Sequence, residues 1–193
     1  MGGKRPTTCC TLTTTLERGG MYVNVEEMRH ALEMLGHRLS QEGLRGDIVI
    51  AGGAWMALVL GSRGVTKDID AYLSPPTEPI RRAASAVAKE LGLPADWLND
   101  GIKGFFYGTP PQELWQEFEG LRVHAVTADY MLALKVYAAR LEDQADVQAL
   151  LQHLGIHTAS AVLDIVERYI PHHMLTAKHE YFAEICVEGL PSM

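Results

Sequence analysis

The segment that most constrains the fold is "IVIAGGAWMALVLGSRGVTKDIDAYL", which covers residues 48–73. Its β-branched start predicts a strand that ends at Gly52 and Gly53. The apolar run after the glycines predicts a buried helix that closes at Gly61. A second strand is expected in "KDIDAYL", before the breaker cluster "SPPTEP". A glycine turn and a strand that carries two carboxylates are therefore expected within one small sheet.

The rest of the chain alternates between helical and extended patterns. Helices are expected at 25–43 and 79–91, and the alternating "LRVHAVT" predicts a third strand at 121–127. The segment 93–112, rich in Gly, Pro and aromatic residues, is expected to be irregular, and several amphipathic helices follow Thr127. This order predicts an α+β protein, with a small mixed β-sheet flanked by helices and a helical C-terminal half.

Composition predicts three segments with different roles. Residues 1–20 are polar and Thr-rich, which is typical of a disordered leader, although Met21 as the true start is an alternative. One domain is expected over 21–155, and a C-terminal helical extension packed on it over 156–193.

Charge and hydropathy exclude several classes of protein. The net charge of −7 argues against a stand-alone nucleic-acid binder, and it suits a protein that recruits divalent cations. No apolar run approaches the roughly 20 residues that span a bilayer, so no membrane association is expected. The three cysteines have no metal-site spacing and form no disulfide framework, which predicts a cytoplasmic protein.

Asp68 and Asp70 are the strongest candidates for chemistry. Residues two apart on a strand share a face, so both carboxylates are expected to project together while Ile69 points to the core. Two carboxylates this close repel each other unless a cation lies between them. Mg²⁺ or Mn²⁺ is the expected cation, bound by one or two carboxylates and by substrate phosphate. The structural alternative is a solvated strand edge.

Gly52 and Gly53 fit the same site. They lie where a strand ends and a helix begins, and free backbone N–H groups at that point favour an anion such as a phosphate. A glycine also lets the anion approach the backbone closely. An ordinary strand-ending turn would account for the pair equally well.

These residues carry a resemblance to a known family. "GGAWMALVLGSRGVTKDID" resembles the signature of the DNA polymerase β-like nucleotidyltransferase superfamily. The motif Arg63-x-x-Thr66-x-Asp68-Ile69-Asp70 is similar to that of the bacterial AbiEii-type toxin group. In that group a later helix carries a Lys, an Arg-rich turn and an Asp-x-x-Asp, and "LALKVYAARLEDQADV" offers this order.

The resemblance implies a role for each matching residue. It places Gly52 and Gly53 around nucleotide phosphates and makes Asp68 and Asp70 metal ligands. The remaining implied residues are Arg63 at a phosphate, Thr66 orienting the Asp68 strand, Lys135 at the triphosphate, and Asp146, with Asp143, completing the acidic site or holding the lysine.

Each of the later residues also has a structural interpretation. Lys135 lies among core-like residues of its helix and snorkels to solvent in that interpretation. Asp143 begins the following helix and suits a cap, whereas Asp146, in its first turn, suits the helix dipole.

One departure from the superfamily pattern concerns a third carboxylate, which is expected on the strand after the Asp-x-Asp hairpin. The candidate strand "LRVHAV" offers only Arg122 and His124. His124 is either a weak metal ligand or a packed strand histidine. Glu119 precedes the strand and is poorly placed. In the narrower toxin-like group a carboxylate from the C-terminal helices can take this position, and the resemblance therefore implies Asp146 as the replacement.

Two further groups of residues invite binding hypotheses. The histidines of "PHHMLTAKH", His172, His173 and His179, suggest a metal, but their spacing favours a surface loop. Five aromatic side chains offer stacking surfaces for a base or cover one sheet face. These are Trp97, Phe105, Phe106, Tyr107 and Trp115.

The resemblance implies a Mg²⁺-dependent nucleotidyltransferase. Such an enzyme transfers NMP from a nucleoside triphosphate to a tRNA, protein or small-molecule acceptor, in a toxin–antitoxin or phage-defence context with an antitoxin partner. The first alternative is a catalytically degenerate nucleotidyltransferase fold that serves as a binding or regulatory, antitoxin-like protein. A metabolic domain with an aspartate-lined small-molecule pocket is the second alternative.

Overall fold

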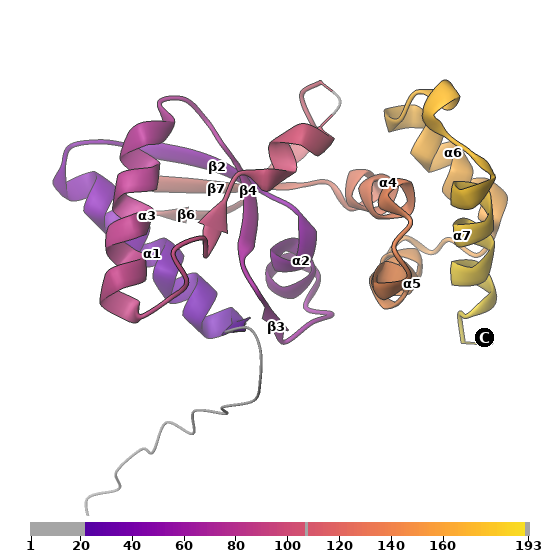
Figure 1. Cartoon of the computed structure of the whole chain (residues 1–193), viewed down its shortest axis with the longest axis horizontal. Helices are drawn as coiled ribbons and strands as arrows, with labels where there is room; N and C mark the ends of the chain where they lie inside the picture. Colours follow the sequence, from indigo (N-terminus) through magenta and orange to yellow (C-terminus); the bar gives the residue numbers. More distant parts are fainter. Residues whose placement is uncertain (1–21, 107, 192–193) are drawn as a thin grey trace, which may run out of the picture.

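The computed structural model describes residues 22–106 and 108–191, and the fold is mixed α+β, as predicted (Figure 1). A five-stranded sheet has the order β5-β4-β2-β7-β6, and β1 and β3 form a small second sheet. The strands are β1 (Val23–Asn24), β2 (Gly46–Ile50), β3 (Val65–Thr66), β4 (Ile69–Leu73), β5 (Leu98–Asn99), β6 (Gln112–Phe118) and β7 (Leu121–Val126).

Strand directions decide which chain segments meet at the edge of the larger sheet. The central strand β2 pairs antiparallel with β4 and parallel with β7, and β4 pairs parallel with β5. The end of β2 therefore lies beside the start of β4. The Ala51 amide donates to the Asp70 carbonyl at 3.1 Å across this junction. The glycine turn and the Asp-x-Asp segment are neighbours for this reason.

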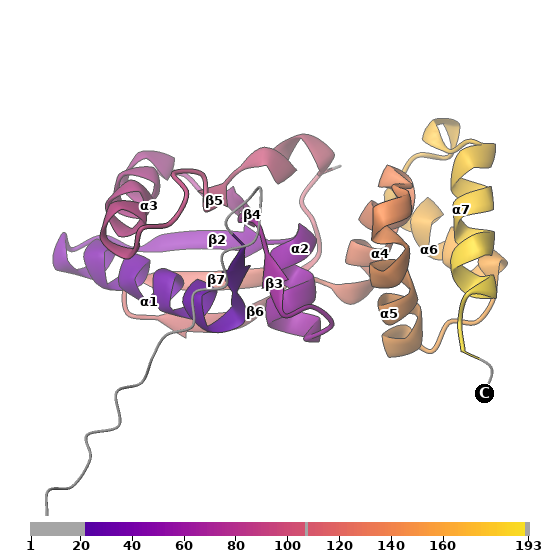
Figure 2. The same cartoon turned by 60° about the horizontal axis from the view of Figure 1, so that its bottom comes forward.

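Two long helices, α1 (Val25–Gln41) and α3 (Thr77–Leu91), pack together and cover one face of the sheet (Figures 1 and 2). Helix α1 begins with a capping box, in which Asn24 accepts from the Glu27 amide at 2.9 Å. Its residues at helical spacing, among them Leu32 and Leu35, are fully buried.

The predicted helix after the glycines is divided into two. Helix α2 (Gly52–Trp55) continues into the π-helical turn η1 (Met56–Leu60), which ends at Gly61 in the left-handed region, with φ of 70°. Trp55 is buried, and its indole N–H donates to the Val126 carbonyl at 2.7 Å. This bond anchors the helix over the end of β7.

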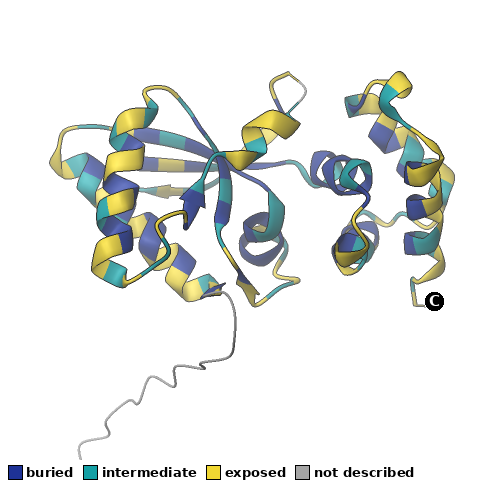
Figure 3. Cartoon of the chain, in the orientation of Figure 1, coloured by how far each residue is buried: buried dark blue, intermediate teal, exposed yellow. Residues whose placement is uncertain are grey.

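The C-terminal half of the described chain is helical, as predicted. It contains α4 (Ala128–Ala138), η3 (Leu141–Asp143), α5 (Gln144–Leu154), α6 (Ala159–Tyr169), η4 (His172–Met174) and α7 (Ala177–Glu188). Helix α4 contacts each of α5, α6 and α7, and it is buried along most of its length (Figure 3). Helices α4 and α5, which precede residue 155, contact the helices that follow it. The predicted domain boundary at residue 155 stays a prediction.

The segment 93–112, predicted to be irregular, contains ordered structure. It holds β5 and the 3₁₀ turn η2 (Gly101–Phe105), and β6 begins at its end. The strand β5 has only two residues, and Pro, Gly and Asp around it mask any alternating pattern, which explains why the sequence did not indicate it. The helix predicted from Pro79 begins earlier, at Thr77.

Two predictions concern the leader and the membrane. The leader at 1–20 and the start at Met21 lie outside the described residues. Among residues 22–106 and 108–191, no single helix is long and apolar enough to cross a membrane. One bent pair, Leu141–Leu154 with Ala159–Tyr169, meets the criteria of length and composition when taken together.

Candidate functional site

The candidate site lies where β2 ends and β4 begins, and Gly52 is packed against Asp70 there. Gly52 has a φ of 64°, in the left-handed region. A Cβ added to Gly52 would lie 2.8 Å from the Asp70 Oδ2 atom, which is closer than real Cβ atoms come. Only a glycine therefore lets the turn and this carboxylate share the space.

Asp68 and Asp70 influence each other electrostatically, as their spacing predicts. Asp68 directly precedes β4 and Asp70 is its second residue, and both are half-buried. Burial raises the pKa of the Asp68 carboxyl above its ordinary value of 3.8, and the Asp70 and Asp96 carboxylates raise it further. The Asn99 hydrogen bond and Lys67 lower this pKa in part. The pair is thus a place where a cation would relieve repulsion.

The strand beside Asp70 on its outer side is β5, and Asn99 lies on it. Asp70 is paired with Asn99 in register, and the Asn99 amide donates to Asp68 Oδ2 at 2.9 Å. Asn99 Oδ1 accepts from the Gly101 amide at 2.8 Å, so both ends of the side chain are held. The strand that follows the Asp-x-Asp strand therefore carries an amide beside the carboxylates. Sequence reasoning missed it because β5 is so short.

The prediction that "LRVHAV" is the strand next after the Asp-x-Asp strand was wrong. It forms β7, which pairs with β2 and β6 and not with β4. His124 lies 3.7 Å from Asp47 Oδ1, on the other side of β2 from the Asp-x-Asp strand. Glu119 accepts from Ser40 at 2.7 Å, just before β7 begins and near the start of β2, at the opposite end of the sheet from Gly52.

Asn99→Asp should lower the free energy of unfolding by about 1–3 kcal/mol at pH 7. The change replaces a donor to Asp68 with a second carboxylate. Each of the two carboxyl pKa values would be raised in the folded state. The loss of stability should therefore be fully present at pH values above the raised pKa values of the two carboxyls. It should diminish as the pH falls toward 3.8, the ordinary pKa of an Asp carboxyl. Urea unfolding at pH 7 and pH 4 measures it.

Asn24→Asp is a matched control for this change. Asn24 caps α1 at an exposed position, and a carboxylate caps a helix equally well, so its effect should stay within about 0.5 kcal/mol. Equal losses in both variants, or a loss at Asn99 that does not change with pH, would contradict the interpretation of Asp68 and Asn99 as a hydrogen-bonded pair.

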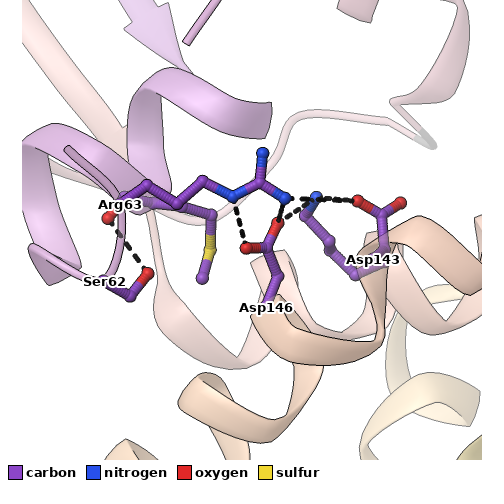
Figure 4. Close-up of polar contacts among 6 residues, drawn as sticks. Ser62, Arg63, Asp143 and Asp146 are labelled. Atoms are coloured by element: carbon purple, nitrogen blue, oxygen red, sulfur yellow. Dashed lines mark hydrogen bonds and ion pairs between the residues drawn. The ribbon is translucent and has the colours of Figure 1, made fainter. Parts of the chain in front are cut away.

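A second cluster of charges joins the α/β part of the chain to the helical half (Figure 4). The Arg63 guanidinium donates twice to Asp146, from Nε at 2.6 Å and from Nη2 at 2.5 Å. The Lys135 ammonium lies 2.6 Å from Asp146 Oδ2 and also donates to Asp143. Two cations and two carboxylates thus neutralise one another in a largely buried cluster.

These contacts bear on the structural interpretations of the three later residues. Asp146 is 3% exposed and holds both Lys135 and Arg63. The snorkelling interpretation of Lys135 is wrong, because its side chain is only 8% exposed and its ammonium is ion-paired. Asp143 lies at the N-cap position of α5, as predicted, but its side chain makes no cap hydrogen bond and instead accepts from Lys135.

Gly53, Thr66 and Arg63 lie close to one another at the glycine turn. A Cβ on Gly53 would lie 2.6 Å from the Thr66 hydroxyl, which is buried beneath the turn. The same added atom would lie 3.9 Å from Arg63 Nη1. Arg63 therefore presents its second N–H₂ group toward Gly53 while Asp146 holds the remainder of the guanidinium.

A pocket of about 260 Å³ opens between the glycine turn, η2 and α4. Asp70, Gly52 and Lys135 line it, which brings residues from both sequence signatures into one cavity. The other lining residues are Gly101, Ile102, Phe105, Met131, Leu134, Ala138, Arg140 and Asp143. Five of the predicted site residues do not line this pocket, namely Gly53, Arg63, Thr66, Asp68 and Asp146.

The histidines of "PHHMLTAKH", predicted to lie in a surface loop, lie in two helical elements. His172 and His173 lie in η4, whereas His179 is buried in α7, where it accepts from the Thr176 amide at 2.9 Å and stacks on Tyr137. Across residues 22–106 and 108–191, no group of three or more His, Cys, Asp or Glu side chains is arranged to hold a metal ion.

Comparison of the chain with protein-family models, with curated proteins and with solved structures finds no match.

Proposed function

We propose that this protein is a nucleotidyltransferase that uses Mg²⁺ or Mn²⁺ to transfer NMP from a nucleoside triphosphate to a hydroxyl group. The observation that carries the proposal is the packing of Gly52 against Asp70 at the mouth of a pocket that also contains Lys135. The acceptor hydroxyl belongs to a tRNA, a protein or a small molecule. A cytoplasmic toxin–antitoxin or phage-defence setting, with an antitoxin partner, completes the proposal.

The residues present fit a divalent cation that is bound together with a nucleotide. Mg²⁺ in nucleotide enzymes takes one or two carboxylates and completes its shell with phosphate oxygens and water. Asp68 and Asp70 supply two carboxylates that repel each other, and Asn99 holds the first of them in place. When bound, the cation supplies charge neutralisation and polarises the phosphoryl oxygens.

The cations around the pocket suit a triphosphate. The Arg140 side chain lines the pocket and makes no ion pair or hydrogen bond to another described residue, so its guanidinium is available to phosphate. Lys135 is neutralised by Asp143 and Asp146 and contributes less net charge. Backbone N–H groups at Gly52 and Gly53 donate to phosphate oxygens in this proposal.

The transfer exchanges one P–O bond for another. The acceptor oxygen forms a bond to the α-phosphorus, the bond from that phosphorus to the β-phosphate oxygen breaks, and pyrophosphate leaves. Asp70, which lines the pocket, accepts the hydroxyl proton.

Labelled nucleotides test this reaction directly. The purified chain is incubated with Mg²⁺ or Mn²⁺, bulk RNA or protein, and triphosphates labelled at either the α- or the γ-phosphate. Transfer of NMP predicts that the acceptor retains α-label and no γ-label, and that chelation by EDTA stops incorporation. Retained γ-label would instead indicate phosphoryl transfer and would reject the proposal.

Gly52→Ala should reduce metal-dependent nucleotide binding by about tenfold or more, because the new methyl group displaces the Asp70 carboxylate. The matched control is Gly61→Ala. Gly61 has a similar φ of 70° but open space around its Cβ position. Each variant should lose about 1 kcal/mol of stability from backbone strain. Calorimetry with Mg²⁺ and a nucleotide should then separate them, and equal weakening in both would contradict a role for the Gly52–Asp70 contact.

A regulatory, antitoxin-like protein with a degenerate nucleotidyltransferase fold is the second candidate. Asn99 favours it, because an amide lies beside Asp68 on the strand that follows the Asp-x-Asp strand. This candidate predicts that nucleotide binds without turnover. Acceptor labelling in the α-phosphate experiment would exclude it.

A further inference from the structure

Five apolar residues line part of the pocket that contains Asp70. Ile102 and Phe105 come from η2, whereas Met131, Leu134 and Ala138 come from α4. The polar side chains in the lining are all charged, namely Asp70, Lys135, Arg140 and Asp143. Among the described residues, the pocket lining therefore offers charge and apolar surface and no neutral hydrogen-bonding side chain.

Phe105 differs from the other described aromatic residues that the sequence singled out. Trp97 is 1% exposed and donates to the Ala84 carbonyl at 3.0 Å. Phe106 contacts the Tyr72 and Tyr130 rings. Trp115 lies under the Arg29 guanidinium, 4.7 Å from its ring centroid. Tyr107 lies outside the described residues.

Phe105 is 42% exposed although it is a large apolar side chain that lines the pocket. An exposed aromatic ring beside a pocket that is charged elsewhere is a surface on which a planar group can stack. The pocket volume of about 260 Å³ is below the roughly 300–1,000 Å³ typical of whole-ligand sites. The cavity therefore suits one part of a larger ligand.

We infer that this apolar wall holds the nucleobase of the substrate, stacked on Phe105 and covered by Met131 and Leu134. This inference rests on the proposed function and adds how the base is recognised. Stacking tolerates every base because each has a π-face. Since the described residues contribute no neutral polar side chain to the wall, the protein should discriminate weakly among bases, with dissociation constants for the four triphosphates within about tenfold.

Phe105→Ala tests the inference when nucleotide and inorganic tripolyphosphate are compared. Binding is measured by calorimetry with Mg²⁺ and α,β-methylene analogues of ATP and UTP, which resist transfer. Loss of stacking should weaken both analogues by about tenfold and leave tripolyphosphate unchanged. Phe105→Trp should retain nucleotide affinity. Tyr181→Ala is the control, since Tyr181 is an aromatic residue of α7 with 65% exposure and lies outside the pocket.

The outcomes separate the base site from the proposed function. Nucleotide binding that survives Phe105→Ala overturns the base site and leaves the proposed function in place. Equal losses for nucleotide and tripolyphosphate, or more than about 100-fold discrimination among the four bases, overturn it as well. If the unsubstituted chain binds neither ligand in the presence of Mg²⁺, the proposed function fails and the base site fails with it.

Discussion

Asp68→Asn combined with Asp70→Asn should reduce transfer of α-labelled nucleotide by about 10³-fold or more. The double change removes both carboxylates of the proposed cation site. Divalent cations stabilise the charge that develops in phosphoryl-type displacement by several kcal/mol, and about 4 kcal/mol corresponds to that factor. The rate of acceptor labelling and the Mg²⁺-dependent affinity for nucleotide measure the effect. Both should fall together.

The same variant should fold at least as well as the unsubstituted chain without metal. Burial and the neighbouring Asp70 raise the pKa of Asp68, so its ionised form opposes folding at neutral pH. Asp164→Asn, an exposed position on α6, is the matched control and should change neither quantity. Labelling that survives the double substitution would refute the assignment of Asp68 and Asp70 to a cation site.

Asp146→Ala should lower the free energy of unfolding by about 3 kcal/mol, which is the largest stability effect that we expect from one polar side chain here. The substitution leaves two cations without their shared carboxylate at a site that is 3% exposed. Arg63, 35% exposed, can turn toward solvent, and Lys135 retains Asp143. The loss should therefore lie near the lower end of the range for broken buried ion pairs. The midpoint of thermal unfolding should fall by roughly 10 °C.

A double-mutant cycle isolates the ion pair within this effect. Arg63→Ala and Asp146→Ala together should cost less than the sum of the single losses, because each single change removes the same pair. Asp164→Ala is the surface control and should stay within about 0.5 kcal/mol. A loss at Asp146 no larger than that of the control, or strictly additive losses, would contradict the interpretation of the cluster as a link between the two parts of the chain.

Local sequence pattern was sufficient to predict the glycine turn at Gly52 and Gly53 and the carboxylate pair of Asp68 and Asp70. The strand, the glycine turn and the helix after it follow from apolar periodicity and from the freedom of Gly52 at positive φ. The shared environment of Asp68 and Asp70 follows from the two-residue repeat of an extended chain. Each of these inferences depends on residues close together in the sequence, where backbone geometry determines which side chains meet.

Helical spacing predicted part of the structure of the segment from Lys135 to Asp146. It placed Lys135 and Asp146 in helices in the right order, but it left the role of each open. One partner of Asp146 is Arg63, which lies 83 positions before it in the chain. Spacing within one helix carries no information about a partner at that distance.

Tertiary structure alone decided how the site is completed. The two-residue strand β5 exists because β4 offers it a free edge, and this pairing places Asn99 beside Asp68. Likewise, Phe105 and Trp97 are equally aromatic in the sequence, yet one is 42% exposed at the pocket and the other 1% exposed under α3. Burial and long-range pairing depend on the whole packed chain. The sequence by itself therefore determined the glycine turn and the carboxylate pair, and the packed chain determined which amide, cations and aromatic ring surround them.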